Sequence, residues 1–321
     1  MSTDLANEVV QLREQVIGEI SRTVVGLDEV ANQLLTALIA GGHVLMEGVP
    51  GTAKTTLCKT FARLLGVDFQ RIQFTPDLLP GDITGTYIFD RQRNEFVLRK
   101  GPIFCQMLLA DELNRAPAKT QSALLEAMQE HQVTIEGKTL PLPEPFLVLA
   151  TQNPIEQEGV YRLPEAQLDR FLLRVEVGYP DRGDEIDMLD IHSSPVEETD
   201  IIAAPETILG LQRKLPSIHV SDELKAYIVD VARQSREHPD LALGASPRAA
   251  LYLMHASRAR AMLNGRQYAT HEDVQVMAEP VLGHRLILRP EAEIEGLEVG
   301  ELIKAITTRV PVTGDSSKRE A

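Results

Sequence analysis

The sequence predicts an α/β protein built on a parallel sheet and followed by a small domain made only of helices. Apolar, strand-like runs alternate with helical runs as far as about residue 182, which is the pattern of a parallel α/β sheet. Beyond about residue 205 the apolar residues recur with a period near 3.6. A length of 321 residues suits about two domains. The expected division is a core over residues 1–182, a connector over 183–205, a helical domain over 206–313 and a disordered tail over 314–321.

Composition and charge limit the class of protein. Hydrophobic residues make up 43% of the chain and charged residues 25%, as in ordinary globular proteins that are soluble in water. No apolar stretch approaches the ~20 residues needed to cross a bilayer, and the N-terminus lacks the character of a signal peptide, so we expect a cytoplasmic protein. The formal net charge of −15 argues against a surface that neutralises many DNA phosphates.

The cysteines indicate a reducing compartment. Cys58 falls in a predicted helix and Cys105 in an apolar run, so both are expected to be small buried thiols. The cysteines and histidines show no spacing typical of a metal site.

The chain begins with two predicted helices. Over residues 5–22 the apolar side chains recur at spacings of three and four, which indicates an amphipathic helix. Val25 and Gly26 lie in the short connection to a second helix, which runs through Ile39. Two glycines at 41 and 42 are expected to end that helix.

A Gly-rich loop between the apolar run 44–46 and the helical run 57–65 is the stretch around which the core is organised. A strand, a Gly-rich loop, Lys-Thr and a helix form the context of a phosphate-binding loop. Backbone N–H groups and the helix N-terminus would hold phosphate oxygens, Lys54 would contact the terminal phosphates, and the Thr55 hydroxyl would ligate magnesium. The loop comprises Gly48, Val49, Pro50, Gly51, Thr52, Ala53, Lys54, Thr55 and Thr56.

Ala53 departs from the usual pattern, which has glycine before the lysine. Because alanine tolerates helical dihedral angles, we expect Ala53 to enter the helix directly. An ordinary Gly/Pro turn before a helix is the alternative interpretation of the whole loop.

Residues 75–104 contain an apparent insertion. Prolines and glycines punctuate it, and two short apolar runs within 86–98 flank a polar segment, which predicts a β-hairpin with a longer loop. The hairpin either packs its aromatic residues on the core or works as a functional insert.

Acidic residues follow the next apolar strand, which we expect over 104–110. Asp111 and Glu112 stand where that strand ends, and parallel sheets bind ligands at the carboxyl ends of their strands. Asp111 could hold magnesium through water, and Glu112 could take a proton from an attacking water molecule. The alternative is a pair of solvated carboxylates in a turn.

Three further residues are candidates for the same chemistry. Asn153, which ends a buried strand over 146–150, could position water, although an Asn-Pro turn would also explain it. Arg170 precedes the last strand of the core; its alternative role is a salt bridge with Asp169 or a nearby glutamate. Arg248 opens a helix where a cation opposes the helix dipole, which suggests an anionic partner.

The second half is predicted to be helical over 222–235, 247–263 and 271–282, with Ser221 and Thr270 as N-caps. A second hairpin is expected over 132–142, turned at Gly137.

At these residues the chain resembles the MoxR family of AAA+ ATPases, in the helix-2-insert clade. The resemblance spans roughly residues 20–290. It lies in the loop with its alanine, in the run around Asp111 and Glu112, and in the segments around Asn153 and Arg248; the four matching runs are 48–55, 109–121, 151–154 and 244–249.

The resemblance implies an AAA+ P-loop NTPase core with a helical lid domain. In that fold the strand that leads to Asn153 lies between the loop strand and the strand that precedes Asp111. The segment 75–104 would hold the clade's insert, and 132–142 would be the hairpin before the Asn153 sensor. Val25 and Gly26 would lie near adenine.

The resemblance also implies roles and partners. Arg170 would be the arginine finger that reaches a neighbour's ATP, and Arg248 would be the sensor of the lid, acting either in its own subunit or across an interface. ATP and Mg²⁺ would be the cofactors, and rings of six are usual in the superfamily. Family members often work with proteins that carry a von Willebrand factor A domain, in maturation of other complexes or metal insertion into them.

The resulting prediction is an ATPase that remodels a partner protein. One alternative is a nucleic-acid motor, which the net charge of −15 argues against. Another is a nucleotide-dependent scaffold without significant turnover, which the joint presence of Glu112, Asn153 and Arg170 argues against.

Overall fold

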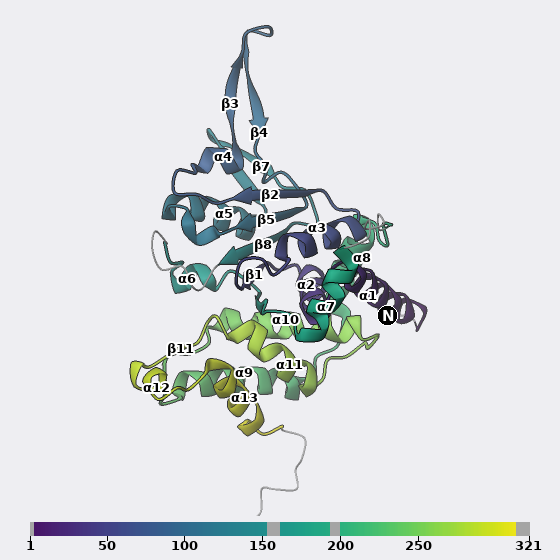
Figure 1. Cartoon of the computed structure of the whole chain (residues 1–321). Helices are drawn as coiled ribbons and strands as arrows, with labels where there is room; N and C mark the ends of the chain where they lie inside the picture. Colours follow the sequence, from purple (N-terminus) through teal and green to yellow (C-terminus); the bar gives the residue numbers. More distant parts are fainter. Residues whose placement is uncertain (1–2, 153–160, 193–199, 313–321) are drawn as a thin grey trace, which may run out of the picture.

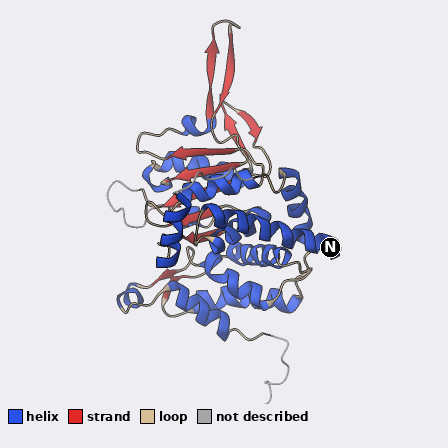
Figure 2. Cartoon of the chain, turned by 45° about the vertical axis from the view of Figure 1, so that its right-hand side comes forward, coloured by secondary structure: helices blue, strands red, loops and turns tan. Residues whose placement is uncertain are grey.

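The structure is a computed structural model that describes residues 3–152, 161–192 and 200–312. Figure 1 shows two stacked parts: a core that contains the main sheet, and below it a group of helices formed by the chain from α9 (Asp222–Glu237) onward. A hairpin of β3 (Gly85–Asp90) and β4 (Glu95–Lys100) stands out from the core on the side away from those helices, as the rotated view in Figure 2 also shows. The predicted tail over 314–321 lies outside the described residues.

The core sheet has five parallel strands in the order β2-β5-β8-β1-β9. The strand before Asn153, β8, therefore lies between the loop strand β1 and the Asp111 strand β5, which confirms the expected order. The strands are β1 (Val44–Glu47), β2 (Phe69–Gln73), β5 (Met107–Asp111), β8 (Leu147–Gln152) and β9 (Leu173–Glu176).

Helices cover both faces of this sheet, because successive side chains of a strand point to opposite faces. Met107 and Leu109 pack in one cluster with the helices α1, α2 and α3, whereas Leu108 and Ala110 pack in another with α5. The core helices are α1 (Thr3–Thr23), α2 (Asp28–Ile39), α3 (Lys54–Leu64), α4 (Pro80–Thr84), α5 (Ala118–Glu130) and α6 (Glu165–Leu168), with a 3₁₀ turn over Leu113–Arg115.

Both predicted hairpins are confirmed. The strands β3 and β4 pair in an antiparallel register from Gly85 with Lys100 to Asp90 with Glu95. The second hairpin joins β6 (Gln132–Ile135) to β7 (Lys138–Pro141) through Glu136 and Gly137, which both have positive φ angles. Positive φ at both central residues is what a two-residue type I′ hairpin turn requires.

The helical part confirms the three helices predicted there, and both predicted N-caps. The Ser221 hydroxyl accepts a bond from the Leu224 amide at 3.2 Å, and the Thr270 hydroxyl accepts one from the Asp273 amide at 3.4 Å. The helices that follow the last strand of the core sheet are α7 (Arg182–His192), α8 (Pro205–Lys214), α9 (Asp222–Glu237), α10 (Pro247–Leu263), α11 (His271–Leu282), α12 (Pro290–Ile294) and α13 (Val299–Arg309), with a 3₁₀ turn over Leu215–Ser217.

Two details differ from the expectation. The lid is not made only of helices, because β10 (Leu241–Leu243) and β11 (Ile287–Leu288) form a short antiparallel pair. Strands of this length are too short for a period of two to show in the sequence. Strand β5 begins at Met107 rather than at 104, because the preceding residues form turns: the Phe104 amide donates to the Gly101 carbonyl at 3.2 Å, and the Cys105 amide donates to the Ile103 carbonyl at 2.9 Å.

Within the described residues, none of the helices combines the length and the apolar character that a bilayer span requires. The division of the chain at residues 182 and 206 stays a prediction.

Candidate active site

The predicted loop and the acidic pair meet at one cavity of about 350 Å³. The cavity lies at the carboxyl ends of β1, β5 and β8, where parallel sheets offer their ligand sites. It is lined by Gly48, Pro50, Gly51, Thr52, Ala53, Lys54, Thr55, Thr56, Arg71, Asp111, Glu112, Thr151 and Gln152.

Lys54 is folded back onto its own loop. Its Nζ donates to the Gly48 carbonyl at 2.9 Å, to the Val49 carbonyl at 2.7 Å and to the Thr52 hydroxyl at 3.2 Å. These acceptors satisfy the three protons of the ammonium group. Burial lowers the pKa of Lys54, while the nearby charge of Asp111 acts in the opposite direction. An anion that enters the loop can replace these neutral oxygens with charged ones, which bind an ammonium more strongly.

Two glycines give the loop its path. Gly48 follows β1, and a Cβ at that position would lie 2.2 Å from the Val177 carbonyl oxygen, so no larger residue fits. Gly51 has a φ of +86°, with open space where a side chain would be. The backbone is therefore free to curve around a ligand in front of the N-terminus of α3.

Ala53 does not take the helical dihedral angles that we expected. Its φ of 56° and ψ of 16° are left-handed, and α3 begins only at Lys54. The strain arises because the alanine Cβ crowds the backbone in this region, at about 1–2 kcal/mol for an L-residue. Glycine in the usual pattern would avoid that strain, so the loop geometry is retained here at the expense of local stability.

Asp111 is held by two side chains that the sequence did not suggest. Arg71 in β2 donates to Asp111 Oδ2 from Nε at 3.0 Å and from Nη2 at 2.6 Å. The Thr151 hydroxyl, at the end of β8, donates to Asp111 Oδ1 at 2.6 Å. No local pattern marks Arg71, since an arginine on an edge strand is ordinarily solvated; its role follows only from the position of β2 beside β5.

Glu112 turns away from the strand through a left-handed backbone, with a φ of 57°. Its amide donates to the Thr151 hydroxyl at 2.8 Å, its carboxylate accepts a bond from Gln73, and Arg115 Nε lies 3.1 Å from Oε2. Thr151 thus links the two acidic residues. A non-glycine residue in this conformation is often found at functional sites.

The donor set suits a hard divalent cation. Thr55 and Asp111 both line the cavity and offer a hydroxyl and a carboxylate, which are oxygen ligands of the kind that Mg²⁺ prefers. Among the described residues no group of three His, Cys, Asp or Glu side chains could hold a metal by itself. Magnesium in such sites is usually bound by one or two protein oxygens together with substrate phosphates, and these residues fit that pattern.

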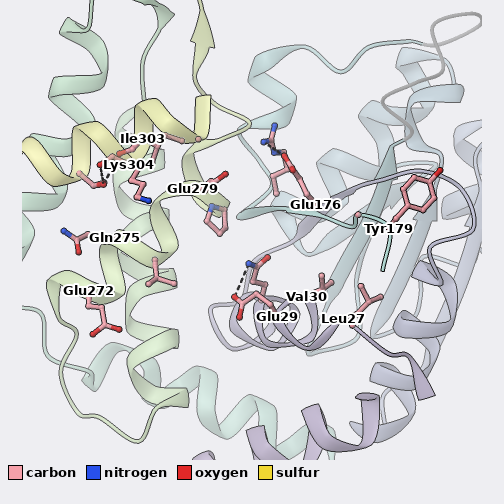
Figure 3. Close-up of a pocket in the computed structure, with 18 of the residues that line it drawn as sticks. Leu27, Glu29, Val30, Glu176, Tyr179, Glu272, Gln275, Glu279, Ile303 and Lys304 are labelled. Atoms are coloured by element: carbon pink, nitrogen blue, oxygen red, sulfur yellow. Dashed lines mark hydrogen bonds and ion pairs between the residues drawn. The ribbon is translucent and has the colours of Figure 1, made fainter. Parts of the chain in front are cut away.

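A second cavity of about 680 Å³ opens between the core and the lid. Figure 3 shows that Leu27 and Tyr179 border it from the core side, and Gln275 and Ile303 from the lid side. Gly26 also lines this cavity, whereas Val25 is half-buried beside it and does not. The expectation that this connection lies near adenine stays a prediction.

Arg170 and Arg248 do not line the cavity at the loop. Arg248 Nη1 lies 3.8 Å from Asp169 Oδ2, so its anionic partner in this structure is a residue of the core. Within the described ranges the Arg170 side chain makes no ion pair or hydrogen bond, and Asp169 is paired instead with Arg285 and Arg248. Asn153 lies outside the described residues, and β8, which leads to it, ends at Gln152 in the cavity wall.

Both cysteines are free and buried, as predicted. Burial raises the pKa of the Cys58 thiol and of the Cys105 thiol to about 12. Neither thiol is therefore ionised near neutral pH, so a packing role fits both better than a chemical one.

Comparisons with known proteins agree with this geometry. Residues 43–173 match the model of the ATPase family associated with various cellular activities (AAA), and residues 233–306 match the AAA lid domain. The chain is 47% identical over 298 residues to Chaperone MoxR1 of Mycobacterium tuberculosis, covering 90% of this chain and 78% of the relative. It is 32% identical to Protein MoxR of Paracoccus denitrificans, covering 90% and 93%. A crystal structure of a candidate ATPase from Cytophaga hutchinsonii superposes with a TM-score of 0.90 at 41% identity, covering 96% and 97%.

Proposed function

The chain belongs to the MoxR family of AAA+ ATPases and is an ATPase, and from this premise we propose that it hydrolyses Mg·ATP at the loop cavity, within an oligomeric ring, to remodel a partner protein. The observation that supports this most strongly is the convergence of Lys54, Asp111 and Glu112 on one cavity at the carboxyl edge of the sheet. Phosphoryl transfer to water needs neutralised phosphate charge, a metal and an oriented nucleophile, and these residues offer one group for each.

Binding would begin with an exchange of partners. Phosphate oxygens would replace the Gly48 and Val49 carbonyls on the Lys54 ammonium. Mg²⁺, when bound, neutralises phosphate charge in the transition state. Asp111 would take part in holding it, either through the lone pairs that Arg71 and Thr151 leave unused or after Arg71 has released Oδ2.

Hydrolysis would then use groups from the subunit that binds ATP and from a neighbouring subunit. Glu112 would accept the proton of the attacking water, which Asn153 would help to position. Arg170 of a neighbouring subunit would approach the phosphates to stabilise transition-state charge, and Arg248 would report on the nucleotide through the lid. The absence of Arg170 from its own cavity supports a role in trans.

Remodelling requires a surface that reaches a partner, and the hairpin β3–β4 supports this part of the proposal. It projects from the core (Figure 1), and near its tip Phe89 and Phe96 are 50% and 69% exposed, with ring centroids 5.3 Å apart. The tip carries charges of both signs, which suits a protein better than the phosphates of DNA. The proposal includes a partner with a von Willebrand factor A domain, a client complex undergoing maturation or metal insertion, and a cytoplasmic site of action.

The test compares Glu112→Gln with the wild type. The glutamine keeps the shape and hydrogen bonding of the side chain but removes the carboxylate, so ATP binding should persist while phosphate release falls about 10²–10⁴-fold. Turnover at the wild-type rate would remove Glu112 from its role, and a wild type that binds ATP without measurable turnover would favour the scaffold alternative. Salt-dependent binding of duplex DNA would favour the nucleic-acid motor.

A further inference from the structure

The seam between the core and the lid contains a buried arginine, Arg285, that no sequence pattern marked. It follows α11 in the lid, and only 3% of its side chain is exposed. A buried charge is tolerated only when it is paired and hydrogen-bonded. The groups that bond to the Arg285 guanidinium are therefore held in place, because the loss of any of these bonds would leave a buried charge without a partner.

All five N–H groups of Arg285 are accounted for. Nε donates to Asp169 Oδ1 at 2.8 Å, and Nη2 donates to the carbonyls of Asp169, at 3.2 Å, and Phe171. Nη1 donates to the Leu172 carbonyl at 3.3 Å and to the Val281 carbonyl. The guanidinium therefore binds the backbone on both sides of Arg170.

Other lid groups hold the same core segment. The Ser246 hydroxyl lies 3.2 Å from Asp169 Oδ2, and Arg248 Nη1 lies 3.8 Å from the same atom. His284 Nε2 lies 3.2 Å from the Phe171 carbonyl oxygen. Segment 169–172 is thus bound both by the start of α10 and by the turn after α11.

Arg170 differs from its neighbours, because its backbone is held while its side chain makes no bond to another described residue. A residue whose backbone is fixed, and whose guanidinium is bonded to no other described residue, is suited to reach outside its own subunit. To move this segment relative to the lid, the protein would have to break several hydrogen bonds of a buried charge, which is costly.

We propose that Arg285 is a positioning residue for Arg170: it ties the finger segment to the lid, so that the two move together and a change of lid position alters the neighbour's active site. The inference rests on the proposed function, since it assumes that Arg170 acts in trans. Arg285 touches no reacting atom. Its substitution should therefore change the position of Arg170 in the neighbour's active site, and with it the turnover there, but not the affinity of its own subunit for ATP.

The first variants are Arg285→Met, which removes the charge, and Arg285→Lys, which keeps the charge but loses the five-donor fork. Displacement of a catalytic group by about 1 Å can lower a rate about 10²-fold, so we expect Arg285→Met to lose about that much turnover with unchanged ATP affinity. Arg285→Lys should fall between it and the wild type. The matched control is Arg266→Lys, which alters the ion pair between the half-buried Arg266 and the buried Asp273 inside the lid and should keep the wild-type rate.

Mixed rings then separate positioning from a general structural role. Glu112→Gln subunits have a dead site but a well-placed Arg170, so mixing them with Arg285→Met subunits should restore activity at the sites of the latter. Arg170→Ala subunits have a live site but no finger, so mixing them with Arg285→Met should restore nothing. Native mass spectrometry would confirm that the rings contain both variants.

The opposite pattern, with recovery only in the second mixture, would overturn the proposal by placing the defect in the variant's own site. Wild-type turnover by Arg285→Met and Arg285→Lys would also overturn it. If Arg285→Met does not fold, Arg285→Lys takes its place in both mixtures. Wild-type turnover by Arg170→Ala alone would instead refute the finger itself, which is part of the proposed function.

Discussion

The loop cavity and the core–lid seam hold their charged groups in opposite ways. At the cavity, Lys54 is bound by carbonyls of its own loop and Asp111 by Arg71, which are partners that a ligand can replace. At the seam, Arg285 is buried and every one of its N–H groups is bonded. At the loop cavity, the contacts of Lys54 and Asp111 can be exchanged for contacts with a ligand. At the seam, the contacts of Arg285 hold the backbone of segment 169–172 in one position relative to the lid.

Among the variants that test this comparison, Arg170→Ala should have the largest effect on the rate of ATP turnover, because it removes the side chain whose backbone the seam holds in place. An arginine donated in trans is worth roughly 10³–10⁵ in rate, so turnover should fall by about that factor while ATP binding persists. Steady-state phosphate release and calorimetric titration measure the two quantities. The control is Arg162→Ala, an exposed arginine nearby in sequence. Equal effects of both substitutions would speak against a special role for Arg170.

Lys54→Ala tests the cavity side. Among the described side chains that line the cavity, Lys54 alone carries an ammonium group, so its removal should abolish tight ATP binding. The control is Lys59→Ala, on the exposed face of α3, which should bind ATP like the wild type. Calorimetric titration of both variants decides the matter, and unchanged affinity in Lys54→Ala would mean that this loop does not bind the phosphates.

The hairpin β3–β4 gives a prediction that separates chemistry from partner binding. Reversal of charge at Arg91 and Arg93 should leave basal ATP turnover nearly intact, because the hairpin tip stands far from β1 and α3, which flank the loop (Figure 1), while it weakens capture of the partner protein. Co-purification with the Glu112→Gln background would trap the partner. If the charge-reversed protein captures as much partner protein as the Glu112→Gln protein without charge reversal, the hairpin tip has no part in partner binding.

Much of the cavity could be predicted from the sequence, because its signals are local. Lys54 lies in a loop motif, and Asp111 and Glu112 stand at the end of an apolar strand. Arg71 and Thr151, which bond to Asp111, were not assigned any role, since they come from neighbouring strands and their positions depend on the sheet order.

The seam could not be predicted, because its pairing is distant in the chain. Asp169 and Arg285 are 116 residues apart, and neither periodicity nor motif spacing links positions so far from each other. Sequence reasoning offered Asp169 only as a salt-bridge partner for Arg170. In the structure the Asp169 carboxylate contacts Arg285, Arg248 and Ser246 instead.

Ala53→Gly should have the smallest effect. Glycine would relieve the left-handed strain of about 1–2 kcal/mol but would lose about 0.5–1 kcal/mol to the greater entropy of the unfolded chain. The free energy of unfolding should therefore rise by about 0–1.5 kcal/mol. Urea unfolding measures this change, and Ala62→Gly in the interior of α3 is the destabilising control. A loss of stability in Ala53→Gly would contradict the left-handed backbone at this position.

The central claim is that one active site takes Glu112 from its own subunit and Arg170 from the next. The most direct test measures ATP turnover in rings assembled from Glu112→Gln and Arg170→Ala subunits, with both variants shown by native mass spectrometry to be present. Some interfaces in such rings combine a live Glu112 with a donated Arg170, so activity should reappear above that of either variant alone. If Arg170 acted within its own subunit, every site would lack one essential group and turnover would stay at the level of the separate variants, which would contradict the account.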